Sequence, residues 1–320
     1  MRNVTVVALW SGLKLTVCLL LTMLFFQTPV VNAQESPLIL VLSAEESESY
    51  IQARKAFEEH LRQNFRGVEF LYHHIEKGAK ITASQVLSGT MGQRPAAVFS
   101  LGSRAAEFAQ AVLPDYPLVA SMIAKDNALK RKTNYTGILL HFPAEIQLHW
   151  LGEFLPQAKR VGILYDPALN SDWVKEAENA AQKTGIKIIA LEVSTPKQLK
   201  SALKHISRNA DVLLAIPDQT VYSGKTSKQV LLFTYRNRIP FVGLSAPWVK
   251  AGALYALGVD YRDLGRQAAE LIKKNLEGVP PKTSIFHPEK VAYTVNNRIK
   301  DYLHLDINPV LIKGASRVYE

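Results

Sequence analysis

Short apolar runs alternate with amphipathic stretches along most of this chain, and this alternation restricts the fold more than any other feature. Residues 37–42 form a near-continuous apolar run, which is typical of a strand buried on both faces of a sheet. Residues 50–65 then place Phe57, Leu61 and Phe65 at every fourth position, on one side of a predicted helix. The same two patterns recur as far as residue 244.

The alternation falls into two series. The predicted strands are 37–42, 68–72, 96–101 and 117–123 in the first series and 136–140, 161–165, 186–191, 212–216 and 240–244 in the second. The predicted helices are 50–65, 103–112, 143–155, 171–182, 195–207 and 228–237. Such alternation predicts parallel sheets with right-handed crossovers. A chain of 320 residues is also long for a single domain. We therefore expect an α/β protein with two Rossmann-like, doubly wound lobes.

The N-terminal segment has the layout of a secretory signal. Arg2 and Lys14 precede an uncharged apolar run over 15–26, and Ala33 ends a small-x-Ala cleavage motif. We predict a signal peptide over 1–33, cleavage after Ala33 and a periplasmic mature protein. The alternative is an uncleaved anchor, but the apolar run is shorter than the ~20 residues of a membrane span.

Residue types exclude several classes of chemistry. The single cysteine, Cys18, lies inside the predicted signal, so disulfides, cysteine-ligated zinc and thiol nucleophiles are excluded after it. No G-x-S-x-G, G-x-G-x-x-G or H-E-x-x-H motif occurs. Gly224-Lys225-Thr226 resembles the end of a phosphate-binding loop, but Gln219 stands where its first glycine is required. We predict a protein that is not an enzyme and has neither cofactor nor metal.

The charge is basic and dispersed. Lys and Arg number 38 against 28 Asp and Glu, for a net charge of +10. No basic stripe with interleaved aromatics is visible, so the pattern favours a solvated basic surface without a nucleic-acid partner. A weak attraction for anionic ligands or membrane headgroups stays open.

Several motifs, taken in their order and spacing, carry a family resemblance over nearly all of the chain after residue 33. They are Tyr135-Thr136-Gly137, residues 153–167, Ile216-Pro217-Asp218-Gln219-Thr220-Val221, Ala251-Gly252-Ala253-Leu254, residues 258–269 and the closing segment from Tyr293 to Val318. Together they resemble the substrate-binding proteins of ABC transporters that include tryptophan- and tyrosine-type uptake receptors.

The resemblance implies a type I periplasmic-binding-protein-like fold, in which two lobes joined by a three-crossing hinge close on a solute. The expected lobes are 34–123 plus 258–281 and 136–257 plus 286–320, with 124–135 as the first hinge crossing and further crossings near 252–258 and 281–286. It also implies a monomer that delivers a small molecule, such as an amino acid, to an inner-membrane ABC permease with a cytoplasmic ATPase. The alternative is a ligand-sensing module for a membrane signalling partner.

Ligands of doubly wound sheets bind beyond the carboxyl ends of the strands, and polar residues at those ends are the candidates for ligand binding. In the first lobe, Gly102 and Ser103 open a helix whose N-terminus suits a carboxylate, although Ser103 is equally suited to capping that helix. Ser43 and Ser121 end two other strands of this lobe.

The second lobe supplies four further candidates. Asp218 follows a strand in the motif that matches the family, where its carboxylate would hold an α-amino group or, alternatively, stabilise a turn. Ser245 follows the next strand. Tyr255 and Asp260 lie near a predicted crossing, where the tyrosine would either stack on a ligand or pack inside the lobe.

Overall fold

The computed structural model describes residues 36–78, 80–124, 134–279 and 284–320. The predicted signal at 1–33, nearly all of the first predicted crossing at 124–135 and part of the third at 281–286 lie outside the described residues. No helix of the described part of the chain is long and apolar enough to cross a membrane.

The first sheet has six parallel strands in the order β11-β5-β4-β3-β1-β2. They are β1 (Leu38–Ser43), β2 (Glu69–His74), β3 (Ala97–Leu101), β4 (Leu118–Ile123), β5 (Tyr135–Leu139) and β11 (Ser284–Phe286). The central strands β3 and β4 are buried along their whole length, as their continuous apolar sequence predicts.

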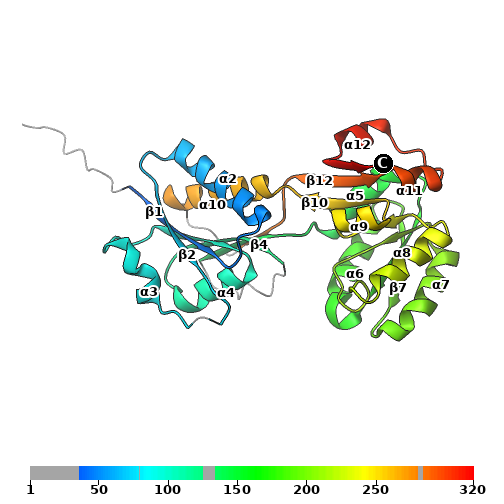
Figure 1. Ribbon diagram of the computed structural model, residues 1–320, viewed down its shortest axis with the longest axis horizontal. Coiled ribbons are helices and arrows are strands. Elements are labelled where there is room, and N and C mark those ends of the chain that lie inside the picture. Colours follow the sequence, from blue (N-terminus) through cyan, green and yellow to red (C-terminus); the bar gives the residue numbers. More distant parts are fainter. Residues whose placement is uncertain (1–35, 79, 125–133, 280–283) are drawn as a thin grey trace, which may run out of the picture. The chain divides into compact units, whose positions relative to one another are not determined.

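Helices cover both faces of this sheet. They are α2 (Glu48–Asn64), α3 (Ala83–Leu87), the short η1 (Ser88–Thr90), α4 (Ser103–Val112) and α10 (Tyr261–Leu276). α2 and α10 pack side by side over one hydrophobic cluster, and α4 packs over another (Figure 1). Gly265 of α10 permits the close approach of these two helices, because a Cβ there would lie 2.0 Å from the Ala53 carbonyl oxygen.

The sequence assigned one strand to the wrong sheet. Residues 136–140 were expected to open the second lobe, but β5 pairs in parallel with β4 and belongs to the first sheet. Ile138 and Leu139 enter different clusters of the first core, so this strand is buried on both faces. An apolar run of this length predicts a buried strand, but it does not specify which of two sheets contains it.

The second sheet has seven strands in the order β13-β12-β10-β9-β8-β6-β7. They are β6 (Arg160–Tyr165), β7 (Lys187–Glu192), β8 (Val212–Leu214), β9 (Phe241–Val242), β10 (Tyr255–Val259), β12 (Val291–Asn296) and β13 (Arg317–Tyr319). β10 and β12 are antiparallel, which departs from the all-parallel expectation. After β10 the chain enters α10 in the first core and later returns through β12.

This topology also relocates two predicted crossings. The segment near 252–258 contains most of β10, so the chain leaves the second sheet only after Val259. The segment near 281–286 ends in β11, which pairs with β5 in the first sheet, and the chain reaches β12 only at Val291. A paired strand buries its backbone hydrogen-bonding groups, whereas a crossing exposes them. Sequence hydropathy alone did not distinguish a strand from a crossing in these two segments.

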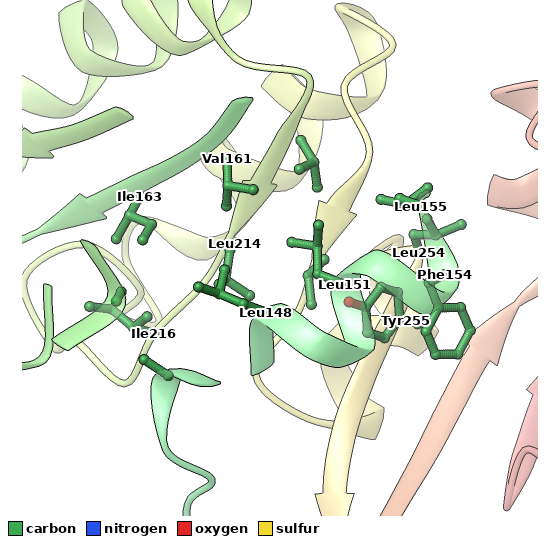
Figure 2. Packing of buried hydrophobic residues seen from close by; sticks show 14 of the residues in the cluster. Leu148, Leu151, Phe154, Leu155, Val161, Ile163, Leu214, Ile216, Leu254 and Tyr255 are labelled. Carbon is green, nitrogen blue, oxygen red and sulfur yellow. The ribbon is translucent and has the colours of Figure 1, made fainter. Parts of the chain in front are cut away.

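Helices pack on both faces of the second sheet. They are α5 (Ala144–Phe154), α6 (Pro167–Ala181), the short η3 (Pro196–Gln198), α7 (Leu199–Asn209), α8 (Ser227–Arg236), α9 (Ala246–Ala251), α11 (Asn297–Tyr302) and α12 (Pro309–Gly314). α5 and α6 bury their apolar sides in one cluster, part of which Figure 2 shows, and α7, α8 and α9 bury theirs in another. Neighbouring strand residues such as Leu213 and Leu214 enter different clusters, so the two helix groups cover opposite faces.

The start of α6 differs from the predicted one. A helix was expected over 171–182, but α6 begins at Pro167, and Asp166 accepts the capping hydrogen bond from the Ala168 backbone N–H at 3.0 Å. Ser171 lies inside the helix and donates to the Pro167 carbonyl oxygen at 2.7 Å. Proline in the first turn after an aspartate is a favourable helix start, which explains why α6 begins four residues earlier than predicted.

Candidate functional site

A pocket of about 410 Å³ lies beyond the carboxyl ends of strands in the second sheet. Residues after β8 and β9, residues of β10 and β12, and the segment that follows β5 surround it. The side chains that bring hydrogen-bonding or aromatic groups to its wall are His141, Phe142, Gln147, Ser245, Tyr255, Tyr261, Tyr293, Thr294 and Ser316. This position at strand ends is where ligands of doubly wound sheets bind.

The wall of this pocket carries little charge. Apolar residues such as Leu214, Leu244 and Leu257 predominate, and no Asp, Glu, Lys or Arg occurs among the described residues that line it. Its volume is within the range of small-molecule sites, roughly 300–1,000 Å³. The wall therefore suits a solute with a large uncharged part and a few hydrogen-bonding groups.

Two histidines tie together chain segments beside this pocket. His287, which follows β11, uses Nδ1 to hydrogen bond with the His141 carbonyl oxygen at 2.9 Å, and the two rings meet edge to face with centroids 5.5 Å apart. The Gln267 side chain of α10 donates to the His287 carbonyl oxygen at 3.0 Å. Segments from three parts of the chain thus hold His141 at the wall of the pocket.

Ser245 and Tyr255 are the two predicted site residues that border the pocket. Ser245 precedes α9 as its N-cap residue, and its side chain makes no capping hydrogen bond. Tyr255 is fully buried, and its ring stacks on Phe154 at a centroid distance of 4.0 Å (Figure 2). Burial raises the pKa of its hydroxyl. The ring of Tyr255 therefore packs inside the lobe, which was the alternative interpretation of this residue.

Asp218 is buried at the end of β8, and its carboxylate accepts four hydrogen bonds from this chain. Oδ2 accepts from the Asp166 backbone N–H at 2.7 Å and from the Asn170 side chain at 2.8 Å. Oδ1 accepts from the backbone N–H groups of Thr220 and Val221, each at 2.9 Å. The carboxylate thus fixes the loop that carries Pro217 to the wall of the pocket.

Three predicted residues of the first sheet lie together. The Gly102 backbone N–H donates to the Ser121 carbonyl oxygen at 2.8 Å, and the Ser103 hydroxyl accepts from the Ala124 backbone N–H at 3.1 Å. The N-cap residue of α4 is Gly102 with φ 88°, and a Cβ there would lie 2.5 Å from the Tyr50 hydroxyl oxygen. Ser103 is therefore the first helical residue and not the cap.

Ser121 has a buried hydroxyl with no hydrogen-bond partner among the described residues. The next residue, Met122, has φ 61°, and the pairing of β4 with β5 shifts register between Ala120 and Ile123. A bulge with a left-handed non-glycine residue thus follows Ser121 directly. Such irregularities occur more often than average beside functional sites.

The two remaining predicted residues have local structural partners. Ser43 donates to the Glu45 carbonyl oxygen at 2.5 Å. Asp260 caps α10, where it accepts from the Asp263 backbone N–H at 3.1 Å. Asp260 also borders a second cavity, of about 280 Å³, lined chiefly by charged side chains of α2 and α10. In the described part of the chain, no group of three or more His, Cys, Asp or Glu side chains is placed to hold a metal ion.

The segment that follows β5 supplies pocket residues that were not predicted. His141, Phe142 and Gln147 line the pocket, and none of them was a candidate. The rule that ligands bind after strand ends applies to His141, which follows the apolar run at 136–140. Thr294 and Ser316 had no comparable signal, because β12 and β13 come after the alternating pattern ends.

Comparisons with known proteins identify the family of this chain. A family model described as ABC transporter substrate binding protein matches residues 46–319. A tyrosine-binding protein from Clostridioides difficile (strain R20291) is 23% identical over 206 residues, which cover 62% of this chain and 59% of that protein. A protein of Rickettsia prowazekii (strain Madrid E) is 26% identical over 127 residues, which cover 40% of this chain and 41% of that one. The matches therefore span less than two thirds of these relatives.

Two solved structures have the same fold. The ligand-free, open structure of a substrate binding protein with adhesive properties from Clostridium difficile has a TM-score of 0.70 at 20% identity and covers 88% of this chain and 99% of that one. An ABC domain in complex with L-Trp from Streptococcus pneumonia has a TM-score of 0.55 at 21% identity, with the same coverage. These likenesses confirm the predicted two-sheet α/β architecture of periplasmic binding proteins.

Proposed function

Because the chain belongs to the ABC transporter substrate-binding protein family, we propose that it is an extracytoplasmic receptor that delivers a small solute to a membrane permease driven by a cytoplasmic ATPase. The observation that carries this proposal is the pocket of about 410 Å³ beyond β8, β9 and β10. Cleavage of the predicted signal after Ala33 would release the receptor as a freely diffusing monomer.

We propose an amino acid with an aromatic side chain as the solute. The uncharged wall offers Phe142, Tyr261 and Tyr293 to such a side chain, and Ser245 and Gln147 as hydrogen-bonding groups. The names of two similar proteins, one tyrosine-binding and one solved with L-Trp, support the same class.

The charged groups of an amino acid need partners outside this neutral pocket. We propose that the α-carboxylate meets the N-terminus of α4 at Gly102 and Ser103, where the backbone N–H groups of the first helical turn and the helix dipole favour an anion. Closure of two lobes, each built on one of the two sheets, would bring the N-terminus of α4 to the solute bound in the pocket. Asp218 contributes by holding the loop of Pro217, because its oxygens already accept four hydrogen bonds.

Calorimetry and thermal unfolding of the purified protein test this proposal. L-Tyrosine or L-tryptophan should bind and raise the unfolding temperature, since a ligand at 100 times its Kd adds about 2.7 kcal/mol of stability. L-Alanine and D-ribose are the controls. Binding of ribose with no response to any amino acid would contradict the proposed ligand class and leave the receptor role standing.

A further inference from the structure

Helices α5 and α6 on one face of the second sheet differ from α7, α8 and α9 on the other in the sign of their exposed charges. On α5 and α6 the exposed charged side chains are mostly acidic, namely Glu145, Glu153, Asp172, Glu176 and Glu178 against Lys175. On the opposite face, the exposed charged side chains of η3, α7, α8, α9 and the loops at their ends are all basic. This basic face consists of Lys197, Lys200, Lys204, Arg208, Lys225, Lys228, Arg236, Arg238 and Lys250.

Helix α7 shows how the sequence builds this face. Lys200, Lys204 and Arg208 recur every fourth residue and so lie along one side of the helix. Leu203 and Ile206 lie on the opposite side, buried against the sheet. The three basic groups therefore point directly away from the core, into solvent.

No acid of this segment neutralises the basic face. Between residues 194 and 259 the acids are Asp211 and Asp218. Asp211 is bound to Arg160 at the start of β6, and Asp218 is buried in its own hydrogen-bond network. Among the described residues, no member of the basic face forms an ion pair with a carboxylate. A surface of this kind maintains a positive potential that attracts anions.

Exposed apolar side chains lie within the basic face. On α8, Leu232 is 42% exposed and Tyr235 is 46% exposed, close in sequence to Lys228 and Arg236. Tyr235 stacks on Tyr302 of α11 with centroids 4.2 Å apart, which holds its ring in place. Amphipathic aromatic and leucine side chains flanked by Lys and Arg are characteristic of surfaces that rest in the interfacial layer of a membrane.

We propose that the basic face is a peripheral docking surface for an anionic lipid bilayer. Its lysines and arginines attract the acidic headgroups, and Leu232 and Tyr235 enter the interfacial layer. The exposed apolar pair favours a bilayer over a soluble polyanion, for which charge alone would suffice. Figure 1 shows α7 and α8 adjacent on one side of the second sheet, and no residue of the basic face lines the pocket. The proposal is therefore independent of the solute.

Vesicle co-sedimentation of the exported protein tests this surface. The wild type should bind phosphatidylglycerol vesicles at low salt and release them at high salt. It should not bind phosphatidylcholine vesicles. The triple variant K200E/K204E/R208E should bind at least about tenfold more weakly, since each basic residue near the surface contributes about fivefold. The matched control K175E/K183E/K187E makes the same change of net charge at exposed positions on or near α6 and β7. It should bind within about twofold to threefold of the wild type, because screening limits distant charges.

A second variant separates a bilayer from other anions. The double substitution L232S/Y235S should weaken vesicle binding and leave binding to heparin, a soluble polyanion, unchanged. The melting temperature of each variant serves as the folding check. Equal vesicle binding by the two triple variants would overturn the proposal. So would heparin binding combined with no vesicle binding by the wild type, which would indicate a soluble polyanion as the partner.

Discussion

The carboxylate of Asp218 accepts a hydrogen bond from the backbone N–H of Asp166 at 2.7 Å, which joins the loop after β8 to the end of β6. Asp166 in turn accepts from the Thr220 hydroxyl at 2.7 Å. The two aspartates thus fix two strand ends of the second sheet beside the pocket. A buried carboxylate with this many donors is a rigid structural element, since each donor would be left unpaired without it.

Replacing Asp218 should therefore affect folding and binding together. Asp218→Ala leaves the buried backbone N–H group of Val221 and the part-buried one of Thr220 without their acceptor, and we expect a loss of about 3 kcal/mol in the free energy of unfolding. Urea unfolding and ligand calorimetry on the same variant measure both effects. Asp172→Ala on the exposed side of α6 is the control and should change neither. Weaker binding at unchanged stability would instead support direct contact between Asp218 and the ligand.

Narrowing the pocket should weaken ligand binding without unfolding the protein. Gly258 of β10 borders the pocket, and a Cβ there would have the Ala292 carbonyl oxygen at 3.8 Å as its nearest described neighbour. Gly258→Val suits a strand and narrows the pocket, so we expect affinity to fall at least about tenfold, or 1.4 kcal/mol. Gly224→Val, outside the pocket, is the matched control. Wild-type affinity in Gly258→Val would place the ligand elsewhere.

The sequence predicted the α/β class because buried strands and amphipathic helices have distinct periods. It predicted the family through the resemblance of its motifs. It could not assign 136–140 to a sheet, because burial on both faces looks the same in either sheet. His141, which follows β5 and lines the pocket, was missed although it comes directly after a predicted strand. Asp218 was located correctly at a strand end. The sequence could not show that its carboxylate accepts hydrogen bonds from Asp166 and Asn170, because these residues lie about fifty positions away along the chain.

A fall in pH should remove the contribution that the ion pair of Arg160 and Asp211 makes to the stability of the fold. Arg160 donates to Asp211 Oδ1 at 2.6 Å, and the backbone N–H groups of Lys159 and Arg160 donate to Oδ2. The Arg160 hydrogen bond is the main reason that the pKa of Asp211 lies below its ordinary value of 3.8. Because the pKa of Asp211 is lower in the folded protein than in the unfolded protein, its ionised carboxylate stabilises the fold. This stabilisation is complete above the pKa of the unfolded state and is lost as pH falls through the pKa of the folded state.

Asp211→Asn tests this pH dependence. Urea unfolding at a series of pH values should show the wild type more stable than the variant at pH 7, with the difference shrinking as pH falls below about 4. Asp172→Asn is the control for general charge effects, and its difference from the wild type should stay small at every pH. A difference between the wild type and Asp211→Asn that is constant with pH would show that the ionised carboxylate is not the stabilising group.

The contact between α2 and α10 should be intolerant of a single methyl group. A Cβ at Gly265 would lie 2.0 Å from the Ala53 carbonyl oxygen and 3.0 Å from the Phe57 nitrogen, and neither backbone atom can move without shifting α2. Gly265→Ala should therefore lower the free energy of unfolding by about 2–3 kcal/mol, the usual scale of overpacking. Gly152→Ala in α5 is the opposite case, because its Cβ would have no described atom within 4 Å. It should raise stability by about 0.5–1 kcal/mol, since alanine favours a helix over glycine. A change of the urea midpoint in the same direction by both substitutions would contradict the close approach of α2 and α10 at Gly265.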